Sequence, residues 1–185
     1  MQISFHKIQR CSECGEQGQF VKNITVKHIV KKDISKDLND EDFHLCRNPS
    51  CIVGYYNTDT NVIVNKDDFK RPIWIKEGSD PVIACYCGNI KEDDVIKAVI
   101  ETDLTELQPI MIYLHGSIGD KCQVTNPTGH CCTAFFKETI AKGLTIKETL
   151  KEYGDLKIDS KEVPKEVYDK LKELEKAKEA KLKTI

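Results

Sequence analysis

Cys11-Ser12-Glu13-Cys14-Gly15 opens the first of two cysteine sets that decide the fold, and Cys46-Arg47-Asn48-Pro49-Ser50-Cys51 completes that set. Two thiolates separated by two residues can hold one cation while the backbone turns, and a glycine eases that turn. Four cysteines leave no coordination position open, so the spacing predicts a structural, tetrahedral zinc site rather than a catalytic one. Iron or cadmium would accept the same sulfurs, and His44 is an alternative ligand. The predicted zinc ligands are Cys11, Cys14, Cys46 and Cys51.

The number of cysteines favours metal binding over disulfides. The chain of 185 residues contains nine cysteines, an odd number that cannot pair completely. No apolar signal segment follows Met1, so we expect a cytoplasmic protein whose thiols stay reduced. Clustered cysteines in such a compartment favour metals, with disulfides as the alternative. Metals would also supplement the thin cores of small domains.

The charges of the chain nearly balance. It has 28 Lys and Arg residues against 30 Asp and Glu residues, for a formal net charge of −2. Such a chain exerts no overall attraction on nucleic acid, so we expect no nucleic-acid partner. We expect no membrane span either, since no apolar run is long enough.

The second set begins with Cys85-Tyr86-Cys87-Gly88 and continues with Cys122, Cys131 and Cys132. One residue between the first two thiols is too short a spacing for most zinc knuckles, but it suits sulfurs that bind iron from a loop. A [2Fe–2S] cluster needs four thiolates, two on each iron, and this set offers five. The sequence therefore predicts a [2Fe–2S] cluster, with zinc as the alternative metal.

Helical register distinguishes Cys131 from Cys132. A ligand at the start of a helix should face the core together with the residues four and eight positions later. For Cys132 these residues are Phe136 and Ile140, whereas for Cys131 they include a polar threonine. We therefore expect Cys132 to be the fourth ligand and Cys131 to be a buried bystander or an alternate ligand. The predicted cluster ligands are Cys85, Cys87, Cys122 and Cys132.

Hydrophobic periodicity predicts an α+β chain. Alternating residues bounded by turn signals predict strands over residues 20–27, 61–65 and 70–76. Helical spacing and capping signals predict helices over residues 91–101, 104–114, 129–141, 144–153 and 164–182. In this scheme Gly143 ends one helix before the next begins.

Composition divides the chain into three predicted parts. We expect a β-rich zinc-binding module over residues 1–80, a helical [2Fe–2S] module over 81–143 and a charged helical tail over 144–185. The tail carries a thin apolar stripe at Val167, Leu171 and Leu174. Such a stripe would pack on the body of the protein or pair with a partner.

The second cysteine set resembles the [2Fe–2S] domain of bacterioferritin-associated ferredoxins. The resemblance lies in Cys85-Tyr86-Cys87-Gly88-Asn89-Ile90, the helix predicted after it and the distal cysteine pair. Together with the first set and with Asn126-Pro127-Thr128-Gly129-His130-Cys131-Cys132, residues 10–142 resemble the N-terminal region of CopZ-type copper chaperones.

That resemblance implies a zinc module joined to a [2Fe–2S] module whose ligands are Cys85, Cys87, Cys122 and Cys132. CopZ-type chaperones also carry a copper-transfer domain with a Met-x-Cys-x-x-Cys loop. Here the methionines are Met1 and Met111, and no cysteine follows the distal pair. We therefore expect a CopZ-like protein without that domain, which supports copper handling as an electron donor or by docking to a partner.

These features predict a zinc and iron-sulfur protein that transfers single electrons in copper handling, by reducing Cu(II) or supporting Cu(I) transfer. The alternatives are a non-redox binding or sensor module with structural metals, and a Cu(I) carrier. The expected partners are a redox partner or a copper-transport protein, together with copper ions. We do not expect an enzyme, because the sequence shows no Ser-His-Asp order, phosphate loop or dinucleotide fingerprint.

Overall fold

The computed structural model describes residues 8–152 and 164–182, and it divides into two compact units. The sheet unit contains the residues up to Cys87 together with Lys121–Cys131, and the helical unit contains Gly88–Asp120 and the residues from Cys132 onward. The α+β class predicted from the sequence is confirmed. The two units are defined by contacts within the chain, whereas the predicted parts are defined by the metal that each would bind. The predicted division at residues 80 and 143 therefore stays a prediction.

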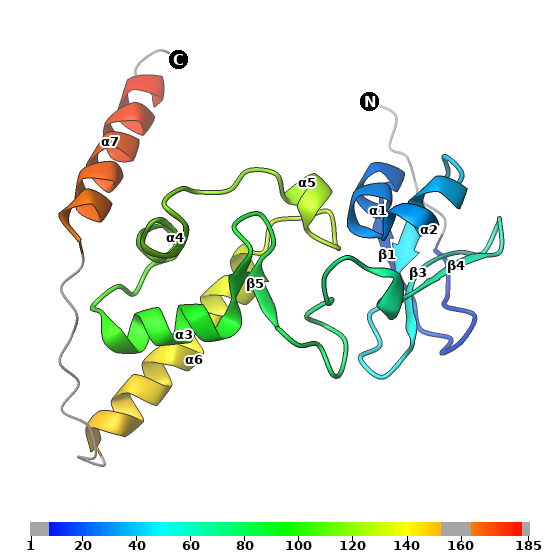
Figure 1. Ribbon diagram of the computed structural model, residues 1–185, viewed down its shortest axis with the longest axis horizontal. Coiled ribbons are helices and arrows are strands. Elements are labelled where there is room, and N and C mark those ends of the chain that lie inside the picture. The colour runs from blue at the N-terminus through cyan, green and yellow to red at the C-terminus, as the bar shows by residue number, and fades with distance from the viewer. Residues whose placement is uncertain (1–7, 153–163, 183–185) are drawn as a thin grey trace. The chain divides into compact units, whose positions relative to one another are not determined.

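A four-stranded antiparallel sheet in the order β1-β2-β3-β4 forms the centre of the sheet unit (Figure 1). Its strands are β1 (Gln19–Val21), β2 (Phe43–Leu45), β3 (Val53–Asn57) and β4 (Val62–Asn65). The other elements of this unit are α1 (Asn23–Ile29), α2 (Lys32–Asp37), the 3-10 turn η1 (Lys66–Asp68), β5 (Ile83–Cys85) and α5 (Cys122–Thr125).

The central strand β3 is buried along its whole length because it lies between two cores. Tyr55 packs in a large apolar cluster, whereas Val53 and Tyr56 pack with the first cysteine set. The register shifts between Val53 and Tyr55, as expected for a β-bulge. Gly54 sits at this shift, where a Cβ atom would collide with the ring of Phe69. The bulge thus allows β3 to place side chains in both cores.

Residues 121–131 join the sheet unit from far along the sequence. Helix α5 packs on α1, and the Thr25 hydroxyl donates a hydrogen bond of 2.6 Å to the Gln123 carbonyl. The buried Tyr55 hydroxyl donates to the Pro127 carbonyl at 2.5 Å. Buried polar groups need such partners, so these bonds fix the segment to the sheet unit.

The helical unit is built on the packing of α3 against α6 (Figure 1). Helix α4 contacts both of these helices and also α7. A Cβ atom on Gly143 would lie 3.1 Å from Val99, which shows how closely α6 approaches α3 at this glycine. The elements of this unit are β6 (Ile90–Lys91), α3 (Glu92–Glu101), α4 (Leu107–His115), α6 (Thr133–Glu152) and α7 (Lys165–Leu182).

Two predicted strands are wrong in whole or in part. The chain is extended only through Lys22, which is the N-cap residue of α1, and α1 occupies the rest of the predicted strand 20–27. Segment 70–76 is irregular. Pro72 has no N–H to donate to a sheet, and the basic side chains of this segment donate instead to backbone carbonyls.

The helix predicted over residues 144–153 is not a separate element. Helix α6 continues through Gly143 to Glu152, because this glycine provides close packing on α3 rather than a helix end. The helix predicted over 91–101 is confirmed as α3, whereas the one predicted over 104–114 begins only at Leu107 and the one predicted over 129–141 begins only at Thr133. Pro109 lies in the first turn of α4, where its missing N–H costs little.

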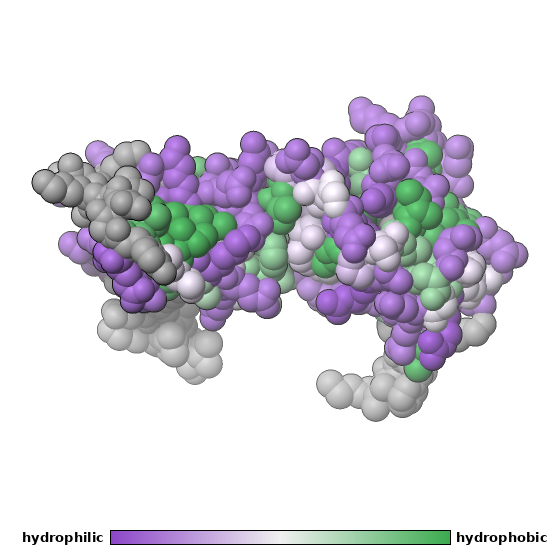
Figure 2. Space-filling model, turned by 90° about the horizontal axis from the view of Figure 1, so that it is seen from below, coloured by the Kyte–Doolittle hydropathy of each residue, from purple (hydrophilic) through white to green (hydrophobic). Residues whose placement is uncertain are grey.

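The surface is mainly hydrophilic, as expected for a chain with 31% charged residues. Figure 2 shows hydrophilic residues over most of one face, with a patch of hydrophobic residues on the helical unit. Among the described residues, every helix is too short or too polar to cross a lipid bilayer.

Candidate metal centres

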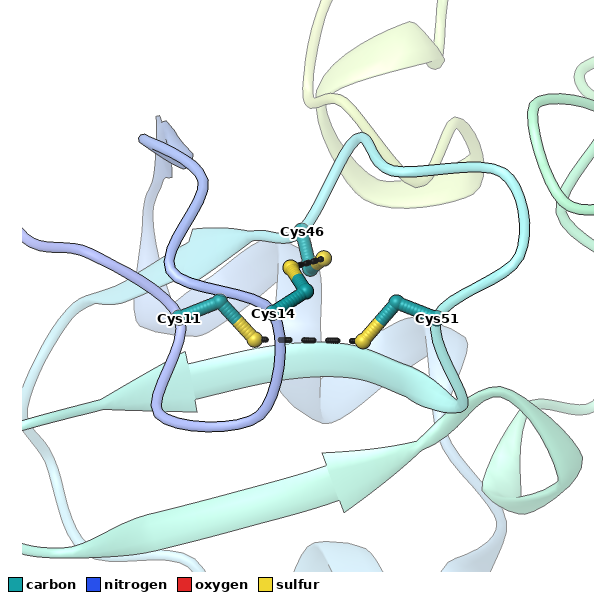
Figure 3. A group of neighbouring side chains, drawn as sticks. All are labelled: Cys11, Cys14, Cys46 and Cys51. Atoms are coloured by element: carbon teal, nitrogen blue, oxygen red, sulfur yellow. Dashed lines mark hydrogen bonds between the residues drawn. The ribbon is translucent and has the colours of Figure 1, made fainter.

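The first cysteine set forms a compact group of four sulfurs. All four Sγ atoms lie within 4.8 Å of one another. The side chains come from two loops and point toward a common centre (Figure 3). The distance from Cys11 Sγ to Cys51 Sγ is 3.9 Å, and that from Cys14 Sγ to Cys46 Sγ is 3.6 Å. Zinc–sulfur bonds of about 2.3 Å give a tetrahedron with sulfur–sulfur edges of about 3.8 Å, so this group fits zinc.

The first loop of this site is a closed turn. The Cys11 N–H donates to the Glu16 carbonyl at 2.9 Å, and the Gly15 N–H donates to the Cys11 carbonyl at 2.8 Å. Gly15 has a φ of 74°, a left-handed conformation that glycine adopts without strain. The glycine noted in the sequence therefore provides the turn that brings Cys11 and Cys14 together.

The second loop of the site follows β2. The Cys46 N–H donates to the Gly54 carbonyl at 2.8 Å, so the sheet fixes one end of the loop. Inside the loop, the Asn48 side-chain oxygen accepts hydrogen bonds from the N–H and the hydroxyl of Ser50, at 3.1 and 3.0 Å. This Asx turn returns the chain to Cys51.

Burial is the largest influence on the pKa of two thiols in this site. It raises the pKa of Cys46 to about 12 and also raises the pKa of Cys11. For Cys14, burial acts in the same direction, but hydrogen bonds from the Glu16 backbone and from the other thiols outweigh it and lower the pKa. Metal binding must therefore displace protons from this site.

His44 does not belong to the four-sulfur group. It is buried on β2, where its ring stacks on Tyr56 and meets the edge of Phe20, both at centroid distances of 5.9 Å. The aromatic rings of Phe20 and Tyr56, on the two neighbouring strands, cover this histidine.

Four cysteines of the second set lie in the sheet unit. Cys87 Sγ is 3.3 Å from Cys122 Sγ and 3.1 Å from the hydroxyl oxygen of Thr125. Cys131 is exposed and interacts with Cys122, whereas Cys85 is buried at the end of β5. Burial, together with the Cys87 and Cys131 thiols, raises the pKa of Cys122 to about 12.

Cys132 lies in the helical unit and precedes α6. Its carbonyl accepts a hydrogen bond of 2.9 Å from the Phe136 N–H. Cys132, Phe136 and Ile140 are all buried, as the helical register predicted. The expectation that Cys131 would be buried is wrong, because it is exposed just before that helix. The choice of the fourth cluster ligand remains a prediction.

In each cysteine set, a basic side chain donates a hydrogen bond to a backbone carbonyl that lies between two cysteines. The sequence does not predict these contacts. The Lys76 Nζ atom donates to the Asn48 carbonyl at 2.8 Å, between Cys46 and Cys51. Arg71 Nη1 donates to the Tyr86 carbonyl at 3.0 Å, between the first two cysteines of the second set. Both cations come from the segment predicted to be a strand, and no local sequence signal connects them with the cysteines.

Comparisons with known proteins agree with the zinc site. Residues 8–70 match the zinc-binding domain family of CopZ. The copper chaperone CopZ of Archaeoglobus fulgidus is 31% identical over 125 residues, which cover 68% of this chain and 58% of that protein. The X-ray structure of the N-terminal domain of A. fulgidus CopZ is 29% identical, with a TM-score of 0.57, and the match covers 70% of this chain and 96% of that domain. Residues 8–70 are therefore similar to a CopZ-type zinc-binding domain, and the chain is similar to CopZ over 68% of its length.

Proposed function

We propose that this protein acts in copper handling, with structural zinc in the first cysteine set and a [2Fe–2S] cluster for one-electron transfer in the second. The observation that carries the proposal is the second thiol group. Cys87 Sγ and Cys122 Sγ lie 3.3 Å apart, with Cys85 and Cys131 in the same unit. Two sulfurs at this distance can share one metal ion.

The looser arrangement of the second set suits a cluster better than a single ion. Among the described residues, only the first set brings three or more donor atoms within 4.8 Å of one another. A [2Fe–2S] cluster distributes its four thiolates over two irons, so thiolates on different irons lie farther apart than those on one ion. This difference is the reason for proposing two irons rather than one zinc in the second set.

When bound, the cluster would supply one-electron redox chemistry. Cys85, Cys87 and Cys122 would hold it, with Cys131 or Cys132 as the fourth ligand. The contact between Cys131 and Cys122 favours Cys131, whereas the burial of Cys132 favours a ligand shielded from water. The Thr125 hydroxyl, close to Cys87 Sγ, would tune the cluster as an outer hydrogen-bond partner.

Copper enters the proposal through the homologous chaperone. With the cluster bound by these cysteines, the protein would supply one electron at a time for the reduction of Cu(II) to Cu(I), and a redox partner would provide that electron. Thiolate sites prefer Cu(I), so this step would prepare copper for a copper-transport protein. In this proposal the protein is cytoplasmic, and it carries electrons rather than acting as an enzyme. The chain spans 58% of the length of the curated CopZ.

A Cu(I) carrier is the second candidate function, and the exposed Cys131 thiol favours it. This thiol interacts with Cys122, so the two sulfurs could hold Cu(I) where a partner can reach it. A non-redox sensor with structural metals is the third candidate, and it would need neither reduction nor copper.

Anaerobic purification followed by metal analysis tests these alternatives. The cluster predicts two irons and one zinc per chain, and an electron-paramagnetic-resonance signal that appears on reduction with dithionite. Cys122→Ser should remove the irons and keep the zinc. Iron-free protein that binds Cu(I) would support the carrier, and a cluster that cannot be reduced reversibly would favour the sensor.

A further inference from the structure

Lys76 is a buried cation beside the first cysteine set. It is 3% exposed, although lysine is among the residues that are rarely buried without a partner of opposite charge. Burial of an ammonium group is costly unless a negative charge compensates it. The buried Lys76 ammonium group therefore needs a compensating negative charge.

The hydrogen bond of Lys76 supplies no negative charge. Its Nζ atom donates to the neutral Asn48 carbonyl at 2.8 Å. Asp67, Glu77 and Asp80 line the same cavity of about 280 Å³, but within residues 8–152 and 164–182 no carboxylate forms an ion pair with Lys76. Its counter-charge must come from another source.

The other buried lysine shows what a conventionally compensated cation looks like. Lys147 is 8% exposed, and its Nζ atom donates to the carbonyls of Val99 and Thr102 near the C-terminus of α3. It also lies 3.5 Å from the Asp103 carboxylate. The helix dipole and this carboxylate both favour a positive charge. Lys76 has neither form of compensation.

Asn48 connects Lys76 to the sulfurs. The Asn48 backbone donates a hydrogen bond to Cys46, and its carbonyl accepts the hydrogen bond from Lys76. Zinc with four thiolates carries a formal charge of two negative units, and Asn48 lies in the loop that supplies two of those thiolates.

The backbone around Lys76 is fixed against the same loop. The Glu77 N–H donates to the Pro49 carbonyl at 3.0 Å, and the Ser79 hydroxyl donates to the Lys76 carbonyl at 2.7 Å. These hydrogen bonds hold the backbone of Lys76 next to the loop.

We infer that Lys76 is the counter-cation of the zinc-loaded four-cysteine site and a positioning residue for the loop from Cys46 to Cys51. The inference rests on zinc in the first set and is independent of the cluster. Residues outside the ligand set commonly change metal affinity by about 10–100-fold when they are lost. We expect an effect of this size from Lys76.

The test measures the rate at which zinc passes from the full chain to a chromogenic chelator. Lys76→Met removes the charge and the donor, Lys76→Gln retains a donor without the charge, and Lys76→Arg retains both. We expect release to accelerate about 10–100-fold in the Met and Gln variants, and much less in the Arg variant. Lys147→Met is the matched control, which removes a buried lysine from the helical unit and should leave zinc release unchanged.

Cobalt substitution gives a second readout that a purely structural role would not change. The charge-transfer bands of the Co(II) protein report the electron density on the sulfurs, so loss of the nearby cation should shift them in Lys76→Gln and spare them in Lys76→Arg. This comparison remains decisive if Lys76→Met does not fold.

Three results would overturn the inference: wild-type release rates in the Met and Gln variants, equal acceleration in Lys147→Met, or an Arg variant that behaves like the Met variant. Wild-type protein that contains no zinc would instead contradict the zinc site itself. The two failures are thus distinguishable.

Discussion

The two cysteine sets differ in how much of each site the folded chain prepares. The four sulfurs of the first set form a compact group fixed by two short loops and the sheet. The second set is more open, with an exposed thiol at Cys131 and another cysteine in the helical unit. A preformed and closed group suits a structural ion, whereas an open group suits a centre that exchanges electrons or metal.

The largest expected difference between the sets lies in folding. A structural zinc contributes about 10–16 kcal/mol of apparent binding energy, which is largely folding energy. We therefore expect Cys46→Ser to lose zinc and the cooperative thermal unfolding of the sheet unit. Cys122→Ser should retain both, because this residue lies outside the zinc group. Zinc analysis and near-ultraviolet circular dichroism measure the two properties, and a folded, zinc-free Cys46→Ser protein would contradict this expectation.

Thiol reactivity should distinguish members of the second set from one another. Burial, together with the Cys87 and Cys131 thiols, raises the pKa of Cys122 to about 12. Only the thiolate is alkylated, so the rate at Cys122 should rise about tenfold per pH unit, or about 100-fold from pH 8 to pH 10. Pulsed iodoacetamide labelling of zinc-loaded, iron-free protein with mass spectrometry measures this slope.

The exposed Cys131 is the internal control for accessibility in that experiment. It should be alkylated before Cys122 at the lower pH. Reaction of Cys122 at pH 8 as fast as a free cysteine peptide would show that its thiol is neither buried nor protonated.

A smaller effect is expected from the bulge that separates the two cores of the sheet unit. In Gly54→Ala the new methyl group collides with the Phe69 ring. Overpacking of this kind costs about 1–3 kcal/mol. Urea unfolding should therefore show a lower midpoint for the sheet unit. The matched change Gly143→Ala, in the helical unit, should leave that midpoint unchanged, and an equal shift would indicate that the two units unfold together.

The sequence predicts the first site well because its information is local. Spacing alone identifies Cys11 and Cys14, and their sulfurs meet those of the second loop in the structure. Helical register also predicts that Cys132 is buried with Phe136 and Ile140. In these cases the residues that matter lie within one loop or two helical turns of each other.

Long-range contacts explain what the sequence could not predict. Nothing local shows that Pro127 accepts a hydrogen bond from Tyr55, so the segment that brings Cys131 to the sheet unit could not be assigned to that unit. Gly143 resembles a helix end until the neighbouring helix is known. The sequence predicts a strand for the segment that contains Lys76, whereas in the structure Lys76 binds a distant carbonyl and the segment pairs with no neighbouring strand.

The smallest expected effect is a change in the reduction potential of the proposed cluster when a nearby arginine is replaced. It tests whether an arginine next to one cysteine set acts on that set alone. Arg71 Nη1 binds the Tyr86 carbonyl in the second set, and Arg10 Nη1 binds the Gly15 carbonyl in the first, both at 3.0 Å. Loss of a nearby positive charge disfavours the electron-rich state, so Arg71→Met should lower the reduction potential of the proposed cluster. A change on the order of 1 kcal/mol corresponds to about 40 mV for a one-electron couple.

Redox titration of the two arginine variants completes the comparison. Arg10→Met should leave the potential unchanged, because its carbonyl partner belongs to the zinc loop. Arg71→Lys should retain most of the wild-type potential, since the charge remains. An equal shift in Arg71→Met and Arg10→Met would mean that the potential follows the overall charge of the chain and that neither cation is dedicated to one set.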